Sequence, residues 1–136
     1  MIKPKRLIIN TDGAAMPNPG PAGIGAILHD EKGNTVAEIS QYIGNSTNNK
    51  AEFLALIAAL EKALELRADH VDLRIDSELL VRQIEGKYRS KLMKKLYEQT
   101  LSLLDEFQSF TIQHIPREQN KEADALSRRA LRLSRH

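Results

Sequence analysis

The periodicity of the apolar residues changes several times along this 136-residue chain, and the order of those changes restricts the folds available to it. Residues 7–15, 23–28 and 35–43 have the short apolar runs and flanking turn residues of strands. Residues 49–66 instead carry one helical stripe, formed by Phe53, Leu56, Ile57, Leu60 and Leu64. Residues 71–76 alternate again as a strand. Three strands, a helical crossover and another strand predict a mixed sheet covered by helices.

The rest of the chain completes this pattern. Helices are predicted at residues 77–85 and 92–109, a last strand at 110–115, and a C-terminal helix at 120–133. That final helix places one apolar face on Ala123, Leu126, Ala130 and Leu133. The expected architecture is an α/β, five-stranded mixed sheet, with three antiparallel strands followed by two parallel ones.

Length and composition exclude several classes of protein. A chain of 136 residues suits one domain, residues 1–136, and no run is long enough to span a membrane. The net charge of +2 permits a nucleic-acid partner without requiring one. Because cysteine is absent, any metal must have oxygen or imidazole ligands. We expect a complete cytoplasmic protein, since Met1 leads directly into the first strand.

Four acidic residues stand in distinctive local patterns, although each has an ordinary structural explanation. Asp12 precedes a glycine, as in many turns. Glu52 follows Asn49 at the spacing of a capping box. Asp76 could cap the next helix, and Asp124 would be favoured near a helix N-terminus. Taken singly, none of the four separates structure from function.

Taken together, the acids point to a metal site. The predicted sheet puts Asp12 and Asp76 at the ends of neighbouring strands, with Glu52 and Asp124 early on flanking helices. Carboxylates so close together repel one another, and burial adds a desolvation cost, so bound cations would stabilise the group. Magnesium suits oxygen ligands, and two such ions can promote phosphodiester hydrolysis. The acids therefore predict a two-metal nuclease centre.

Four segments carry a resemblance to a known family: TDGAAMPNPGPAGIG, NSTNNKAEFLALIAALE, IDSELLV and PREQNKEADALS. In order and spacing they resemble the motifs of type 1 ribonuclease H, in a compact form without the inserted basic handle. The resemblance implies the ribonuclease H-like fold and endonucleolytic cleavage of the RNA strand of RNA/DNA hybrids, leaving 5′-phosphate and 3′-hydroxyl ends. It also implies two Mg²⁺ ions, with Mn²⁺ as a substitute, bound by Asp12, Glu52, Asp76 and Asp124. A monomer is expected.

The same resemblance assigns substrate contacts to polar residues around the first two acids. Asn18, Asn48 and Asn49 match positions that read the minor groove of the hybrid, Gly13 adjoins the first acid, and Thr47 matches a phosphate contact. Asparagine amides both donate and accept hydrogen bonds, which suits recognition of the RNA 2′-hydroxyl. The alternative is that these residues simply make turns and caps.

The first of two departures from the family pattern concerns a histidine that many members place on a mobile loop before the last aspartate. His114 has the expected separation from Asp124 but is predicted inside the last strand, on the side of Phe110 and Ile112, as a packed residue. Arg117 is the obvious cation of the short connection that follows, and its guanidinium suits a phosphate. The alternative for Arg117 is a surface ion pair with a neighbouring glutamate.

A basic segment replaces the inserted handle, and three of its cations are predicted to bind phosphates: Lys87, Arg89 and Lys91. They could equally be solvated surface residues. The arginines of the C-terminal helix have no assigned role. Two other functions remain open from sequence: a hybrid-binding module without activity, and another nuclease that uses the same fold.

Overall fold

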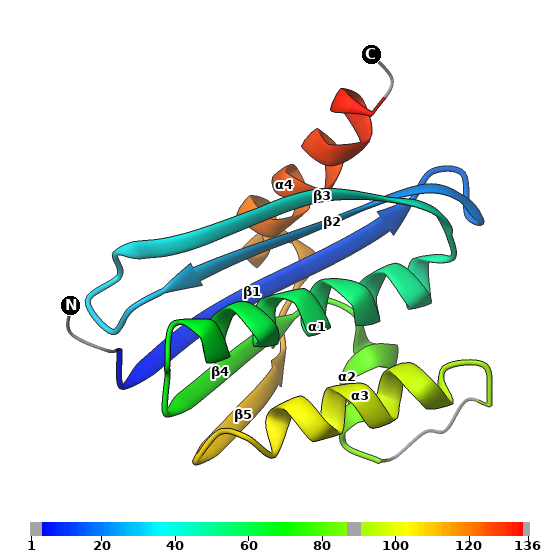
Figure 1. Ribbon diagram of the computed structural model, residues 1–136. Coiled ribbons are helices and arrows are strands. Elements are labelled where there is room, and N and C mark those ends of the chain that lie inside the picture. The colour runs from blue at the N-terminus through cyan, green and yellow to red at the C-terminus, as the bar shows by residue number, and fades with distance from the viewer. Residues whose placement is uncertain (1–3, 87–90, 135–136) are drawn as a thin grey trace.

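The computed structural model describes residues 4–86 and 91–134, in which helices cover both faces of a five-stranded sheet (Figure 1). The strands are β1 (Arg6–Ala15), β2 (Gly20–His29), β3 (Thr35–Ser46), β4 (His70–Ile75) and β5 (Ser109–His114). Their order across the sheet is β3-β2-β1-β4-β5. The first three pair antiparallel, and β4 runs parallel to both β1 and β5, which confirms the predicted architecture.

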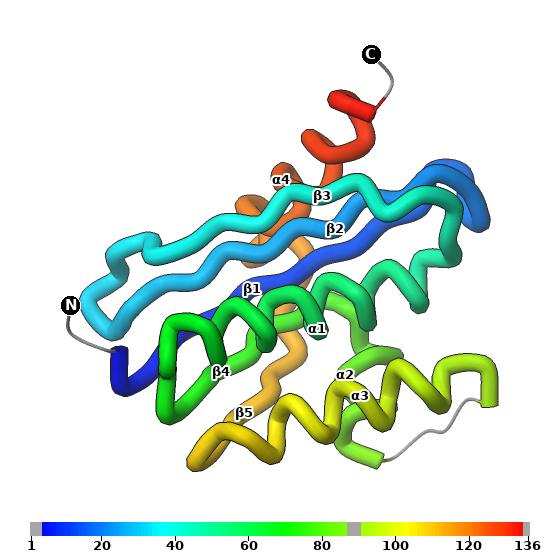
Figure 2. The backbone as a smooth tube through the Cα atoms, in the orientation of Figure 1, coloured from blue at the N-terminus to red at the C-terminus, as the bar shows by residue number. Residues whose placement is uncertain are grey.

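Three helices lie on one face of the sheet and the fourth lies on the other, as the path of the backbone in Figure 2 makes plain. The first face carries α1 (Asn48–Glu65), α2 (Glu78–Ile84) and α3 (Lys94–Leu104). The opposite face carries α4 (Lys121–Leu133), which packs mainly on β2, with further contacts to β3 and β1. The ends of the central strands β1 and β4 therefore lie between two helical layers.

The main core forms between α1 and the sheet. Phe53, Leu56 and Leu60 of α1 are fully buried against Leu7 and Ile9 of β1 and their neighbours. Burial of each large apolar side chain contributes roughly 1.5–3 kcal/mol to stability. The predicted stripe on α1 is thus the face that packs, although Leu64 at its end is only half-buried.

The ends of several elements differ from the predicted ones. The helix expected over residues 92–109 is shorter in the structure and ends with α3 at Leu104. Beyond it, Phe107 enters the core from a turn, and the Gln108 amide donates to the Asp69 carbonyl at 2.8 Å. β2 and β3 are longer than predicted, since Gly20 pairs with Ser46. In α4 the apolar face includes Leu131, whereas Leu133 is 61% exposed at the helix end.

None of the helices in the described ranges has both the length and the apolar character required to cross a lipid bilayer.

Candidate active site

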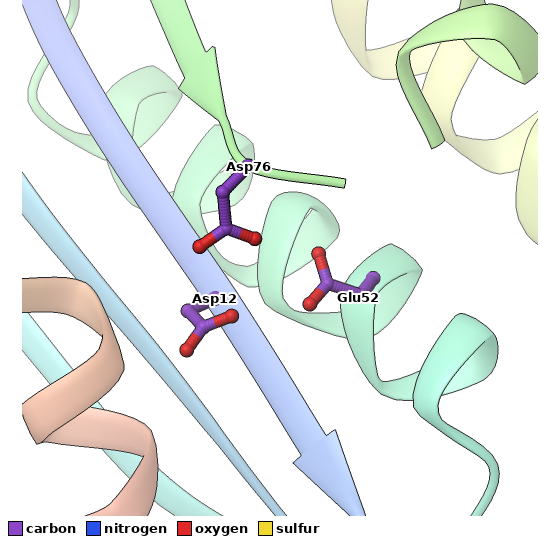
Figure 3. Close-up of side chains that lie close together, drawn as sticks. All are labelled: Asp12, Glu52 and Asp76. Carbon is purple, nitrogen blue, oxygen red and sulfur yellow. The ribbon is translucent and has the colours of Figure 1, made fainter. Parts of the chain in front are cut away.

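Asp12 and Asp76 come together because β1 and β4 are parallel neighbours. The register pairs Thr11 with Ile75, so the next residue of each chain segment reaches the same edge of the sheet. Asp12 is within β1, while Asp76 follows directly after the last residue of β4. Figure 3 shows the two carboxylates directed toward each other and toward Glu52.

Glu52 reaches this edge from the second turn of α1. The backbone amide of Gly13 donates to Glu52 Oε1 at 3.2 Å, which ties the helix to β1 next to Asp12. Residue 13 must be glycine for this contact, because a Cβ there would overlap the backbone of Ala51. The helix cap is made by Thr47, whose side chain accepts from the Lys50 amide at 3.2 Å. The capping-box explanation of Glu52 is therefore wrong.

Three carboxylates form a tight group at this position. One oxygen each from Asp12, Glu52 and Asp76 can be chosen so that all three lie within 4.8 Å of one another. Asp12 is 7% exposed and Glu52 8%. Burial, followed by the charge of Asp76, raises the pKa of Asp12 to about 7. Burial, followed by the charges of Asp12 and Asp76, raises the pKa of Glu52 well above its ordinary value.

The donor set suits a hard divalent cation. All the ligand atoms are carboxylate oxygens, and Glu52 Oε2 is buried without a hydrogen-bond partner among the described residues. An unsatisfied buried oxygen costs free energy, as does the mutual repulsion of ionised acids. A bound cation would offset both costs, so these residues fit the metal that the acid pattern predicts.

Asp124 lies close to this group without belonging to it. It stands in the first turn of α4, and Arg128 Nε donates to both of its carboxylate oxygens at 3.1 Å. Its charge still contributes to the raised pKa of Asp12, after the larger effects of burial and Asp76. The fourth predicted acid is therefore beside the cluster but paired with a cation.

Asp76 is not a helix cap, contrary to its simplest structural explanation. The cap of α2 is Ser77, whose Oγ accepts from the Leu80 amide at 3.2 Å. The carboxylate of Asp76 instead accepts a hydrogen bond from Asn120 Nδ2 at 3.0 Å through Oδ2. The acid therefore remains directed into the site.

Asn120 is a site residue that the sequence analysis missed. It is 1% exposed, and its Nδ2 also donates to the carbonyl of Thr11 at 2.8 Å, while its Oδ1 accepts from Asn10 at 3.0 Å. The side chain thus joins β1, the end of β4 and the start of α4. A polar residue before a helix usually indicates a cap. Here its side chain makes no capping hydrogen bond, so local pattern could not have revealed the role.

The predicted minor-groove residues line one side of an open depression of about 530 Å³ that contains all four acids. Asn18 Oδ1 accepts from the Asn48 amide at 3.0 Å, and Asn48 Oδ1 accepts from the Ala15 amide at 2.7 Å. Asn49 Oδ1 is buried and has no partner among the described residues. Hydrogen bonds between the β1–β2 turn and the start of α1 therefore hold this wall in place.

Arg117, the candidate for phosphate binding, and His114, the candidate for proton transfer, differ in position. Arg117 is exposed on a short 3₁₀ turn, Arg117–Gln119, and lines the same depression as the acids. His114 lies in β5, as predicted, but it is the last residue of the strand and is exposed, so the ring is not packed as expected. Its Nε2 lies 3.2 Å from the Asp76 carbonyl oxygen. The strand ends there and leaves the ring uncovered.

The predicted phosphate-binding cations of the basic segment are only partly described. Lys91 is exposed just before α3. Lys87 and Arg89 lie outside the described residues.

Comparison with known proteins identifies relatives of this chain. The family model described as "Reverse transcriptase-like" matches residues 10–130. Ribonuclease HI of Halobacterium salinarum is 42% identical over 88% of this chain and 61% of its own length. A bifunctional protein of Mycobacterium tuberculosis is 39% identical over 93% of this chain but only 35% of its own length. The chain thus spans less than two thirds of the length of each of these two curated relatives.

Solved structures agree with the sheet order described above. The crystal structure of the Halobacterium RNase H1 superposes with a TM-score of 0.90 at 41% identity, covering 93% of this chain and 97% of that one. LC11-RNase H1, solved in complex with an RNA/DNA hybrid, gives 0.89 at 43% identity and covers 96% and 99%.

A mixed sheet with carboxylates at the ends of its central parallel strands defines the class of ribonuclease H-like folds. Within that class, the coverage and sequence identity of the matches point to a single family. The chain belongs to the ribonuclease HI family.

Proposed function

We propose that this protein is a metal-dependent endoribonuclease that hydrolyses the RNA strand of RNA/DNA hybrids. The observation that carries the proposal is the carboxylate group of Asp12, Glu52 and Asp76, with oxygens within 4.8 Å and two of the three acids buried. Support also comes from LC11-RNase H1, a relative of 43% identity that was solved with such a hybrid.

The four acids would hold the metal. Asp12, Glu52 and Asp76 would be ligands whose oxygens already lie within 4.8 Å of one another, and Asp124 would join them once its carboxylate turned from Arg128. When bound, two Mg²⁺ ions, or Mn²⁺ in their place, lower the pKa of a water and neutralise charge on the phosphate. The products would carry 5′-phosphate and 3′-hydroxyl ends. Glu52 Oε2, which is buried without a described partner, is the oxygen that gains most from a cation.

Recognition of the RNA strand falls to the wall of asparagines. Asn18, Asn48 and Asn49 line the depression and would meet 2′-hydroxyls in the minor groove of the hybrid. The Gly13 amide donates to Glu52 Oε1 at 3.2 Å and keeps this carboxylate next to Asp12. Phosphates further along would be bound by Thr47 and by three cations of the basic segment: Lys87, Arg89 and Lys91.

Arg117 would bind the scissile or an adjacent phosphate, since it lines the depression and presents several donors. His114 has a smaller part, because its ring contacts the backbone after β4. Both assignments rest on position.

The protein would act as a cytoplasmic monomer and as one domain. All four acids come from a single chain, so the site needs no second copy.

The test is cleavage of a 5′-labelled RNA strand in an RNA/DNA hybrid with Mg²⁺ or Mn²⁺. Single-stranded and double-stranded RNA serve as substrate controls, and Asp76→Asn serves as the matched variant. The proposal requires cutting of the hybrid alone, lost in Asp76→Asn. Tight hybrid binding without cutting in either metal would replace it with a binding module, and cutting of another duplex would change the substrate.

A further inference from the structure

A second, smaller depression lies beside the acids, between the β1–β2 turn and α4. Its volume is about 160 Å³, and its lining consists of Met16, Arg128, Leu131 and Arg132. Met16 and Arg128 also line the larger depression that contains the acids, so the two depressions are adjacent. No acidic residue lines the smaller one. A positively charged extension therefore leads away from the candidate active site along α4.

We propose that Arg132, together with the outer nitrogens of Arg128, binds backbone phosphates of the cleaved RNA strand beyond the acid cluster. The RNA strand then follows α4 as it leaves the site. This inference rests on the proposed ribonuclease function and adds to it a subsite on the C-terminal helix. The ligand is the phosphate and ribose of a nucleotide close to the cleavage point.

The spacing along α4 agrees with a strand whose scissile phosphate lies at the acids. Arg128 and Arg132 follow Asp124 by one and two helical turns, roughly 6 and 12 Å along the helix axis. Each strand of a duplex carries one phosphate per roughly 3.4 Å of axis. Both arginines therefore face phosphates within about four nucleotides of the cut.

The chemistry of the lining suits a backbone unit. The volume equals that of about five waters, which accommodates a phosphate with part of a ribose. Met16, which is 43% exposed, and the buried Leu131 make part of the lining apolar, so it can contact a sugar. The arginines at the rim supply forked donors that match phosphate oxygens.

The pairing of Arg128 with Asp124 leaves this role available. Only Nε takes part in those two hydrogen bonds, and a guanidinium has further donors on its terminal nitrogens. Within the described residues, Arg132 makes no ion pair and is exposed. It can therefore meet a phosphate without first breaking another contact.

α4 also offers a matched control. Arg129 is exposed on the same helix, has the same charge, and lines neither of the two depressions. It lies about 100° around the helix from Arg128. Arg132→Ala and Arg129→Ala therefore change net charge equally, and only Arg132→Ala removes a side chain that lines the smaller depression.

The experiment measures hybrid affinity by fluorescence anisotropy in Mg²⁺ over a series of KCl concentrations. Both substitutions are made in an Asp76→Asn background, so that the RNA stays intact. We expect Arg132→Ala to weaken binding about fivefold, the size of one exposed phosphate contact, and to lower the salt slope by about 0.9. Arg129→Ala should match the background protein in both quantities.

Neutral methylphosphonate linkages then locate the contact. They are placed singly in the RNA strand at 2′-deoxy nucleotides, each with a deoxy phosphate control, and singly in the DNA strand of a second set of hybrids. One linkage within about four nucleotides of the cut should weaken the background protein but not Arg132→Ala. Equal affinities of Arg132→Ala and Arg129→Ala would overturn the subsite, as would a matching effect found only in the DNA strand. If the wild-type protein neither binds nor cuts hybrids, the proposed function itself falls.

Discussion

Two buried regions meet on α1, and burial acts on their stability in opposite directions. Phe53 is fully buried in the core under the helix, and its neighbour Glu52 is 8% exposed in the acid cluster. Removing the ring from water stabilises the fold. Removing the carboxylate from water raises its pKa and disfavours its charged form. Burial of Phe53 therefore stabilises the fold, whereas burial of Glu52 costs stability and serves the proposed chemistry.

The difference shows how one helix supports both tasks. The apolar stripe of α1 holds the helix rigidly on β1 and β2, and Gly13 allows the closest approach at the end where Glu52 lies. A carboxylate that would otherwise turn toward water is kept beside Asp12. The core is thus what keeps the acids together in the absence of a cation.

The largest effect should follow removal of one buried charge. Asp12→Asn is expected to lower turnover of an RNA/DNA hybrid by about 10³-fold or more, since it removes one of the proposed metal ligands. Steady-state cleavage measures this. Unchanged secondary structure by circular dichroism is the control, and activity within tenfold of wild type would contradict the assignment.

The opposite result is expected in the apolar region. Phe53→Ala should lower the free energy of unfolding by about 3–5 kcal/mol, because it leaves a cavity under α1. Urea denaturation measures the loss. Turnover per folded molecule, assayed well below the melting temperature, should stay within a few-fold of wild type. A loss of stability below about 1 kcal/mol would show that the two regions differ less than their burial implies.

The pH dependence of stability should separate the regions further. In EDTA, folded Asp12 retains a proton up to about pH 7, whereas the unfolded group loses it near 3.8. The folded state therefore binds more protons between these values, so the free energy of unfolding falls as pH rises through that window.

In the Asp12→Asn variant this loss is absent, so the metal-free variant should be more stable than wild type at pH 8 by about 4 kcal/mol. Urea titrations at pH 5 and pH 8 in EDTA compare the variant with wild type and with Phe53→Ala. The core variant should retain the wild-type pH dependence. A metal-free Asp12→Asn protein less stable than wild type at pH 8 would reverse the sign that we assign to burial in the cluster.

A smaller effect is expected from the exposed groups at the rim. Arg117→Ala should lower turnover about tenfold through loss of a phosphate contact, and His114→Ala by threefold or less. Neither should change the melting temperature by more than a degree or two, since both side chains are exposed. Parallel kinetics of the two variants decide the order, and a larger loss for His114→Ala would exchange their roles.

Most of the architecture could be predicted because it depends on periodicity. The stripe on α1 and the alternation in β4 follow from which side chains must leave water, so the order of elements along the chain and the mixed sheet could be predicted from them. The convergence of Asp12 and Asp76 could be predicted for the same reason, since parallel neighbours bring their ends to one edge.

The features that could not be predicted depend on contacts between distant segments. Asn120 joins Thr11 and Asp76 across more than forty residues of sequence, and no local pattern records that contact. Phe107 enters the core from a turn, although its spacing continues a helical stripe. The pairing of Asp124 with Arg128 is local, yet either partner could have turned elsewhere.

The contact at Gly13 has a consequence for how such a site can change over generations. The separation between β1 and α1 beside the acids is set by main-chain atoms, which every amino acid shares. Substitution at residue 13 adds at least a Cβ, which forces the helix and strand apart in one step. Selection can therefore keep or lose this spacing but has no graded series of variants with which to adjust it. Adaptation to a new substrate must come instead from the surrounding walls, where side chains vary without moving the acids.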